Sequence, residues 1–157
     1  MYYDDLNLIP GVGIGRIKFG MKFDEVKKIL KEDGIVYSTG IDSNKGCTPQ
    51  KEWETIYVKD YMTFCFVENV LWQINAEKEY KGMLENGICI GDSIQNAEKV
   101  DPDLQYDDWN ENFVSAKGYW LFDTVESGNK IYRMTINLLE CMDDDIFYSY
   151  EWLKKYQ

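Results

Sequence analysis

Acidic and aromatic side chains are interleaved in residues 101–115, and both kinds can take part in recognising a protein partner. No basic residue lies between Lys99 and Lys117. Carboxylates steer the approach of a basic partner, and tyrosine and tryptophan supply contact area that loses its water on binding. We therefore predict that this segment is a loop that binds a basic protein. The predicted partner-binding residues are Asp103, Tyr106, Asp107, Asp108, Trp109, Glu111 and Phe113.

The same segment has a second interpretation, in which it only covers the fold. Trp109 and Phe113 would then be core residues, and the carboxylates would keep a loop in solvent, as runs of charge usually do. The two interpretations differ in the exposure of Trp109, which is high in the first and low in the second. Both stay open at the level of the sequence.

Catalytic motifs are scarce in this chain. It has no histidine, which excludes Ser-His-Asp catalysis, Cys-His catalysis and histidine-ligated zinc. The glycines at positions 11, 13 and 15 lack both the G-x-G-x-x-G spacing and the Gly-Lys-Ser/Thr ending of phosphate-binding loops. Paired carboxylates could serve a glycosidase, but 28 acidic residues make chance pairs certain. We predict no catalytic residue and no cofactor, and we keep a carboxylate-based enzyme as the least favoured alternative.

Metal-binding motifs are not indicated either. Asp143, Asp144 and Asp145 are oxygen-ligand types, but they do not match the calcium-binding loop and suit the first turn of a helix. The cysteines form no C-x-x-C pair, so neither a zinc ribbon nor a thioredoxin-like site is expected. We predict no metal site. In a reducing compartment we expect four free thiols, at Cys47, Cys65, Cys89 and Cys141.

The charge balance argues against nucleic acid as a partner. The 157 residues include 28 acidic and 17 basic side chains, for a net charge of −11, and neutralising phosphates requires lysine and arginine. Most of the excess lies in residues 83–157, with 15 acidic and 6 basic side chains. No stretch approaches the 18 apolar residues of a membrane span. The first residues do not resemble a signal peptide, so we expect a cytoplasmic protein.

Two parts of the chain share one pattern. A constant shift of 71 residues aligns Phe19 with Ile90 and Gly20 with Gly91. Each opening predicts a short strand, a glycine turn and a helix, with Phe19 and Ile90 at equivalent buried strand positions. Further strands are predicted at 53–59, 62–67, 70–76, 119–124 and 130–137.

These elements predict an α+β fold, in which helices pack on an antiparallel sheet. We expect a single compact domain over residues 1–157, with tandem repeat halves at about 11–79 and 84–140. A C-terminal helix is predicted at about 143–157, docked by Ile146, Phe147, Tyr150 and Leu153. Residues 37–51 are predicted to be a second irregular loop, because they are rich in glycine and asparagine.

Strict alternation along the strands predicts which side chains share a face. Val70, Trp72 and Ile74 should lie on one face of their strand. In the second half, Trp120 and Phe122 should share a face, as should Tyr132, Met134 and Ile136.

The opening at 13–21, Gly-Ile-Gly-Arg-Ile-Lys-Phe-Gly-Met, resembles the repeat opening of proteins with the β-lactamase inhibitor protein fold. Related openings occur in outer-membrane assembly lipoproteins of the SmpA/OmlA type. The opening at 87–93 is similar to the second repeat of such proteins, and the likeness covers roughly residues 11–137. Lys22 departs from the pattern, because a helix-capping serine or threonine would be expected there. The secretion signal of the inhibitor and the lipid-anchor cysteine of the lipoproteins are also missing.

The resemblance implies a tandem α+β body whose outer sheet face or loops grip another protein. Together with the acidic charge, it leads us to expect a non-catalytic protein-binding inhibitor. The most concrete form is a cytoplasmic immunity protein that neutralises a basic toxin or enzyme domain. The alternative is a structural or assembly module of the same fold with no inhibitory role.

Overall fold

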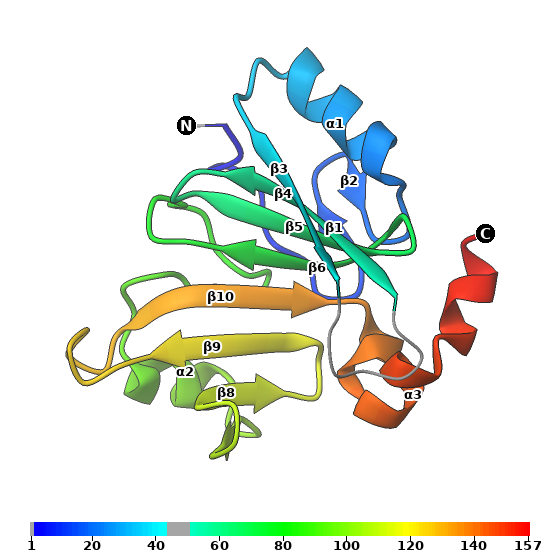
Figure 1. The fold of residues 1–157 in the computed structure, drawn as a ribbon. Helices are drawn as coiled ribbons and strands as arrows, with labels where there is room; N and C mark the ends of the chain where they lie inside the picture. The colour runs from blue at the N-terminus through cyan, green and yellow to red at the C-terminus, as the bar shows by residue number, and fades with distance from the viewer. Residues whose placement is uncertain (1, 44–50) are drawn as a thin grey trace.

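An eight-stranded antiparallel sheet dominates the computed structural model, which describes residues 2–43 and 51–157 (Figure 1). The strand order is β3-β4-β5-β6-β10-β9-β8-β7. The predicted combination of helices with an antiparallel sheet is confirmed. The strands are β3 (Ser38–Ser43), β4 (Glu52–Val58), β5 (Met62–Val67), β6 (Val70–Ala76), β7 (Gln105–Asp107), β8 (Asn112–Ser115), β9 (Tyr119–Asp123) and β10 (Ile131–Asn137).

Two helices each precede four strands of this sheet. Helix α1 (Phe23–Glu32) comes before β3 to β6, and helix α2 (Ile94–Val100) comes before β7 to β10. Ser93 caps α2, because its hydroxyl accepts a hydrogen bond from the backbone N–H of Asn96 at 3.1 Å. The two groups of four strands meet where β6 pairs with β10, and Figure 1 shows these strands side by side.

The main hydrophobic core lies between one face of the sheet and the two helices. Val26 and Leu30 of α1 and Ala97 of α2 are buried in one cluster with Phe64 and Ile136 of the sheet. Burying apolar area contributes roughly 25 cal/mol per Å², so this layer is the chief source of stability. A second cluster joins the opposite face, at Val67, Val70 and Trp72, to the C-terminal segment.

Both predicted loops contain strands. Residues 38–43 of the first form β3, which pairs with β4 along its length, and residues 44–50 lie outside the described residues. The acidic segment 101–115 contains β7 and β8, which form a hairpin at the end of the sheet. Edge strands have few buried side chains, so their sequences lack the apolar alternation that identified the inner strands.

The two glycine-rich openings differ from the predicted single strands. The first forms a small ladder of β1 (Gly13–Ile14) with β2 (Ile17–Lys18), and the second forms no strand in the part of the chain that the structure describes. Phe19 and Ile90 are half-buried against the main core rather than fully buried. The tandem repeat of the two halves stays a prediction.

The C-terminal segment is not one helix. It consists of η1 (Leu139–Met142), α3 (Asp144–Ser149) and η2 (Glu151–Lys155). Tyr150 ends α3 with a left-handed φ of +56°. The first turn of α3 is acidic, as predicted for residues 143–145.

Packing explains why the predicted continuous helix breaks. Phe147 and Trp152 are both buried in the second cluster, and the Trp152 Nε1–H donates to the Phe147 carbonyl at 3.0 Å. Five residues apart on one helix, these side chains would point about 140° away from each other. The left-handed turn brings both to the sheet. Ile146, predicted to dock the helix, is instead 45% exposed.

A β-bulge changes the predicted faces of β6. Phe64 lies opposite Ile74, but Phe66 lies opposite Leu71, so Trp72 is the extra residue on β6. Leu71 and Ile74 therefore reach the main core, whereas Trp72 packs in the second cluster. The predicted common face of Val70, Trp72 and Ile74 is wrong for this reason.

A second β-bulge changes the predicted faces of β10. The pairing of β10 with β9 shifts between Ile131 and Arg133. Met134 and Ile136 reach the main core, but Tyr132 is 37% exposed and does not share their face. Both corrections come from one extra residue in a strand, which no local alternation reveals.

Candidate functional site

We define the acidic hairpin as residues 105–115, comprising β7, β8 and the turn between them. Tyr106 lies opposite Phe113, and Asp107 lies opposite Asn112. Glu111 has a φ of +53° in the turn, a conformation that reverses the chain tightly. The hairpin forms the end of the sheet beyond β9.

Trp109 stands at the tip of this hairpin and is 92% exposed. The interpretation of Trp109 as a core residue is therefore wrong. Asp107 shapes the turn, because its Oδ1 accepts the backbone N–H of Trp109 at 2.9 Å and its Oδ2 accepts the Asn110 side-chain amide at 2.9 Å. The hydrogen bond from Asn110 is the main reason that the pKa of Asp107 lies below its ordinary value. Asp107 thus stays ionised and presents Trp109 to solvent.

The other predicted residues divide into two groups. Asp108 and Glu111 are exposed beside Trp109, and Tyr106 is half exposed with its ring 5.0 Å from that of Phe113. Phe113 is half-buried against the main core, so the structural interpretation holds for this residue. Asp103 precedes the hairpin and lines a separate hollow, which includes Pro102 and Ala116. The structure thus brings together all the predicted residues except Asp103.

A cleft of about 330 Å³ lies beside Trp109, and we call it the aromatic cleft because most of its lining side chains are aromatic. It is formed by the sheet face opposite the helices α1 and α2, by α3 and by the hairpin tip. Within it, the ring centroids of Trp72 and Phe147 are 4.4 Å apart, and those of Trp53 and Trp72 are 6.0 Å apart. Its lining residues are Trp53, Trp72, Trp109, Asn110, Asn112, Trp120, Phe122, Cys141, Asp144, Phe147 and Tyr148.

Sequence reasoning found only part of this cleft. Trp109 was singled out as a contact residue, and Trp120 and Phe122 were predicted to share a face. The contributions of Trp72 and Phe147 were missed, because a bulge places the first and the docking of α3 places the second. No local signal in the sequence indicates either event.

A carboxylate lies in the lining of the aromatic cleft. Among the described residues that line it, Asp144 is the charged side chain, and no lysine or arginine is present. Asp145 is exposed in the same helical turn, and Asp108 is exposed on the hairpin. The carboxylate of Asp144 beside the aromatic rings favours a cation in the cleft.

Three polar atoms of cleft residues have unused hydrogen-bonding capacity. The Asn112 Oδ1, Trp53 Nε1 and Trp72 Nε1 atoms are buried and have no hydrogen-bond partner among residues 2–43 and 51–157. Asn112 is only 2% exposed and Trp72 only 7%. A buried polar group without a partner costs about 1–3 kcal/mol, so a water molecule or a bound group that paired with one of these atoms would be stabilising.

A second hollow lies on the other side of the hairpin. It has a volume of about 570 Å³, and its lining includes Tyr106, Glu111 and Phe113. Arg133 also lines it, but its guanidinium is engaged by Glu77 at 3.0 Å and lies 5.7 Å from the Phe122 ring.

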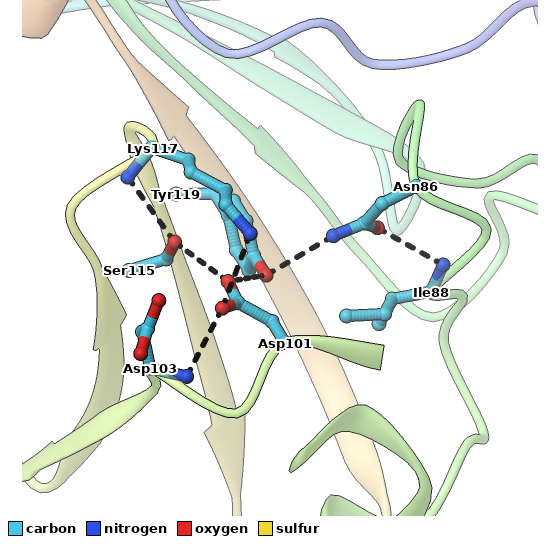
Figure 2. Close-up of polar contacts among 7 residues, drawn as sticks. All are labelled: Asn86, Ile88, Asp101, Asp103, Ser115, Lys117 and Tyr119. Atoms are coloured by element: carbon cyan, nitrogen blue, oxygen red, sulfur yellow. Dashed lines mark hydrogen bonds and ion pairs between the residues drawn. The ribbon is translucent and has the colours of Figure 1, made fainter. Parts of the chain in front are cut away.

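A buried carboxylate holds the hairpin to the rest of the fold (Figure 2). Asp101 follows α2 and is fully buried, and it accepts hydrogen bonds from the hydroxyls of Tyr119 at 2.5 Å and Ser115 at 2.8 Å. The Lys117 Nζ lies 3.2 Å from its Oδ1. Burial acts to raise the pKa of Asp101, but the hydrogen bonds from Tyr119, Ser115 and Lys117 outweigh it and lower the pKa. The network connects α2 to β8 and β9, the strands that carry Asn112 and the Trp120–Phe122 face.

The described thiols show no sign of reactivity. Cys65, Cys89 and Cys141 are free, and Cys47 lies outside the described residues. Burial raises the pKa of Cys65 to about 12, so this thiol stays protonated and inert at neutral pH.

Comparisons with known proteins bear on the fold alone. No known protein family matches this chain, and no curated protein sequence does. The fold is similar to the crystal structure of the uncharacterized protein yfeY from Escherichia coli, with a TM-score of 0.54 and 11% sequence identity. The match covers 82% of this chain and 97% of that one. Within the described ranges, no helix is long and apolar enough to cross a membrane.

Proposed function

We propose that this chain is a non-catalytic protein that binds and inhibits a basic protein partner. In its most concrete form it is a cytoplasmic immunity protein that neutralises a toxin or enzyme domain. The observation that carries the proposal is Trp109, which is 92% exposed at the tip of the acidic hairpin. A tryptophan so exposed leaves a large apolar surface in water, and covering it on binding recovers that free energy.

The proposal gives different roles to the residues of the hairpin tip. Trp109 acts as an anchor, whose removal from an interface costs on the order of 2 kcal/mol or more and mainly speeds dissociation. Asp108 is exposed and mainly steers association, over a distance of about 8 Å at physiological salt. Asp107 instead positions Trp109, because its carboxylate is already engaged by the backbone of the turn.

Matching backbone contacts support the tandem repeat that the resemblance implied. The Gly20 N–H donates to the Leu71 carbonyl, and the Gly91 N–H donates to the Ile131 carbonyl, both at 2.9 Å. The two glycines have φ values of +94° and +96°, a region that favours glycine. In each half, the glycine before the helix is therefore joined to the start of the fourth strand.

The test begins with the protein encoded beside this one, co-expressed with it and isolated as a complex. The proposal expects a basic partner, a 1:1 complex, and loss of the partner's toxicity or activity. Trp109→Ala should weaken the complex by about tenfold or more. The control variant Val36→Ala should bind the partner as tightly as the native protein does. Val36 is 83% exposed and lies between α1 and β3, so it tests whether any exposed apolar residue matters.

Other results would refute the proposal or select its alternative. A complex that forms with no loss of partner activity would favour the assembly module. Asp108→Asn should slow association at low salt and have little effect at high salt. Association rates that do not respond to salt in the native protein would remove the steering role, and the acidity would then serve only solubility.

A further inference from the structure

We propose that the aromatic cleft receives an arginine side chain of the basic partner, next to the contact made by Trp109. This inference rests on the proposed function and adds the chemistry of the group that enters the cleft. The cleft has a volume of about 330 Å³, at the lower end of the roughly 300–1,000 Å³ typical of ligand pockets. It therefore suits one long side chain rather than a loop or a domain.

The walls of the cleft favour a flat cation. Trp72, Trp120, Phe122 and Tyr148 line it, and aromatic faces attract cations through their negative π-surfaces. Arginine is preferred to lysine in such sites because its planar guanidinium stacks on rings and is more weakly hydrated. The described lining of the cleft includes no lysine or arginine. The Arg133 guanidinium lies 5.7 Å from the Phe122 ring but is paired with Glu77.

The polar groups of the cleft match a guanidinium as well. Asp144 supplies a carboxylate at the lining, and its opposite charge complements the guanidinium. The Asn112 Oδ1 is an acceptor with no hydrogen-bond donor among the described residues. A guanidinium has five N–H donors and no acceptor, and it would supply the missing donor if the buried Asn112 side chain turned toward the cleft. The unpaired indole N–H groups of Trp53 and Trp72 are donors and take no part in this contact.

The experiment uses a small probe rather than the unidentified partner. The full chain is titrated with Nα-acetyl-arginine N-methylamide, and the five indole N–H signals are followed by NMR. The matched neutral probe is the citrulline analogue, which has nearly the same shape and no charge. We expect saturable shifts of the Trp72 and Trp120 signals, with a dissociation constant on the order of 1–10 mM, and binding at least fivefold weaker for citrulline.

Two charge-matched variants locate the binding. Asp144→Asn should weaken binding of the arginine probe by about twofold to fivefold, as expected for one exposed ion pair. Asp145→Asn removes the same charge from the same helical turn, but Asp145 does not line the cleft, so its effect should be less than half as large. Equal effects of the two variants would show attraction to the general acidic surface and would overturn the proposal.

The remaining outcomes separate this inference from the proposed function. Equal binding of the two probes, or no shift of the Trp72 and Trp120 signals, would overturn arginine recognition in the cleft. The proposed function would survive that result if Trp109→Ala still weakened an inhibitory complex. Conversely, arginine-specific shifts in a protein with no inhibitory partner would support the cleft assignment and refute the proposed function.

Discussion

Asp101 joins the end of α2 to the strands that carry the acidic hairpin, and its replacement by asparagine tests this connection directly. The carboxylate is fully buried and accepts hydrogen bonds from Tyr119, Ser115 and the backbone N–H of Asp103. Asparagine has nearly the same shape, but it is neutral and presents an NH₂ group where one oxygen accepted. The change therefore removes the charge and at least one acceptor while leaving the packing in place.

The expected cost follows from these contacts. Hydrogen bonds to a charged group contribute about 1.5–3 kcal/mol each, against about 1 kcal/mol for neutral pairs. In Asp101→Asn, the hydrogen bonds from the Tyr119 and Ser115 hydroxyls no longer go to a charged group, and one of the original donors loses its acceptor. Together these changes give an expected loss of about 3 kcal/mol in the free energy of unfolding. The Lys117 side chain is 60% exposed, so its ion pair with Asp101 adds little. In a chain of this size, 1 kcal/mol shifts the melting temperature by roughly 2–4 °C, which predicts a decrease of about 6–12 °C.

The pH dependence separates charge from shape. The pKa of Asp101 in the folded protein lies below that of an unfolded aspartate, which is about 3.9. Its ionised form therefore stabilises the fold above that value, and the contribution is lost as the pH falls through the folded pKa. The stability difference between the native protein and Asp101→Asn should be full at pH 7 and should shrink below about pH 4.

Urea denaturation followed by circular dichroism at pH 7, 5 and 3 measures this difference. Asp103→Asn is the control, because Asp103 is exposed and its side chain makes none of these contacts, and it should cost less than about 0.5 kcal/mol. A difference for Asp101→Asn that stays constant down to pH 3 would refute the role of the charge. A cost below about 1 kcal/mol at pH 7 would refute the network as a structural connection.

Three further predictions concern packing, ionisation and redox state. Trp109→Ala should change the melting temperature by no more than about 1 °C, because Trp109 is exposed. Phe147→Ala should lower the free energy of unfolding by about 3–5 kcal/mol, because Phe147 is buried. A large decrease in the melting temperature of Trp109→Ala would mean that Trp109 is structural. Burial raises the pKa of Tyr80 to about 12, so its stabilising contribution is present below about pH 10 and is lost as the pH rises further. Tyr80→Phe should flatten that decrease between pH 9 and 11 in urea denaturation. Thiol titration under denaturing, non-reducing conditions should count about four per chain, and a count of two or none would reveal disulfides.

Local patterns in the sequence determined the regular elements of the main core. The hairpin of β5 and β6 was predicted with its bounds, because Glu68 and Asn69 form a two-residue turn between apolar strands and both have positive φ. A helix was predicted after the second glycine turn, and α2 forms there, capped by Ser93 and ending before Pro102. The acidic charge and the choice of Trp109 as a candidate contact residue could also be read from the chain. Each of these properties depends on residues within a few positions of one another.

Tertiary contacts decided how the candidate site is assembled. The bulge that turns Trp72 out of the main core depends on the pairing of β6 with β5, and the break after α3 depends on burying both Phe147 and Trp152. The exposure of Trp109 depends on the position of its hairpin at the edge of the sheet. Periodicity describes one element at a time, so it cannot reveal a cleft whose walls come from the sheet, α3 and the hairpin tip. Only the folded chain brings these distant segments together, because the free energy that places them is that of their mutual burial.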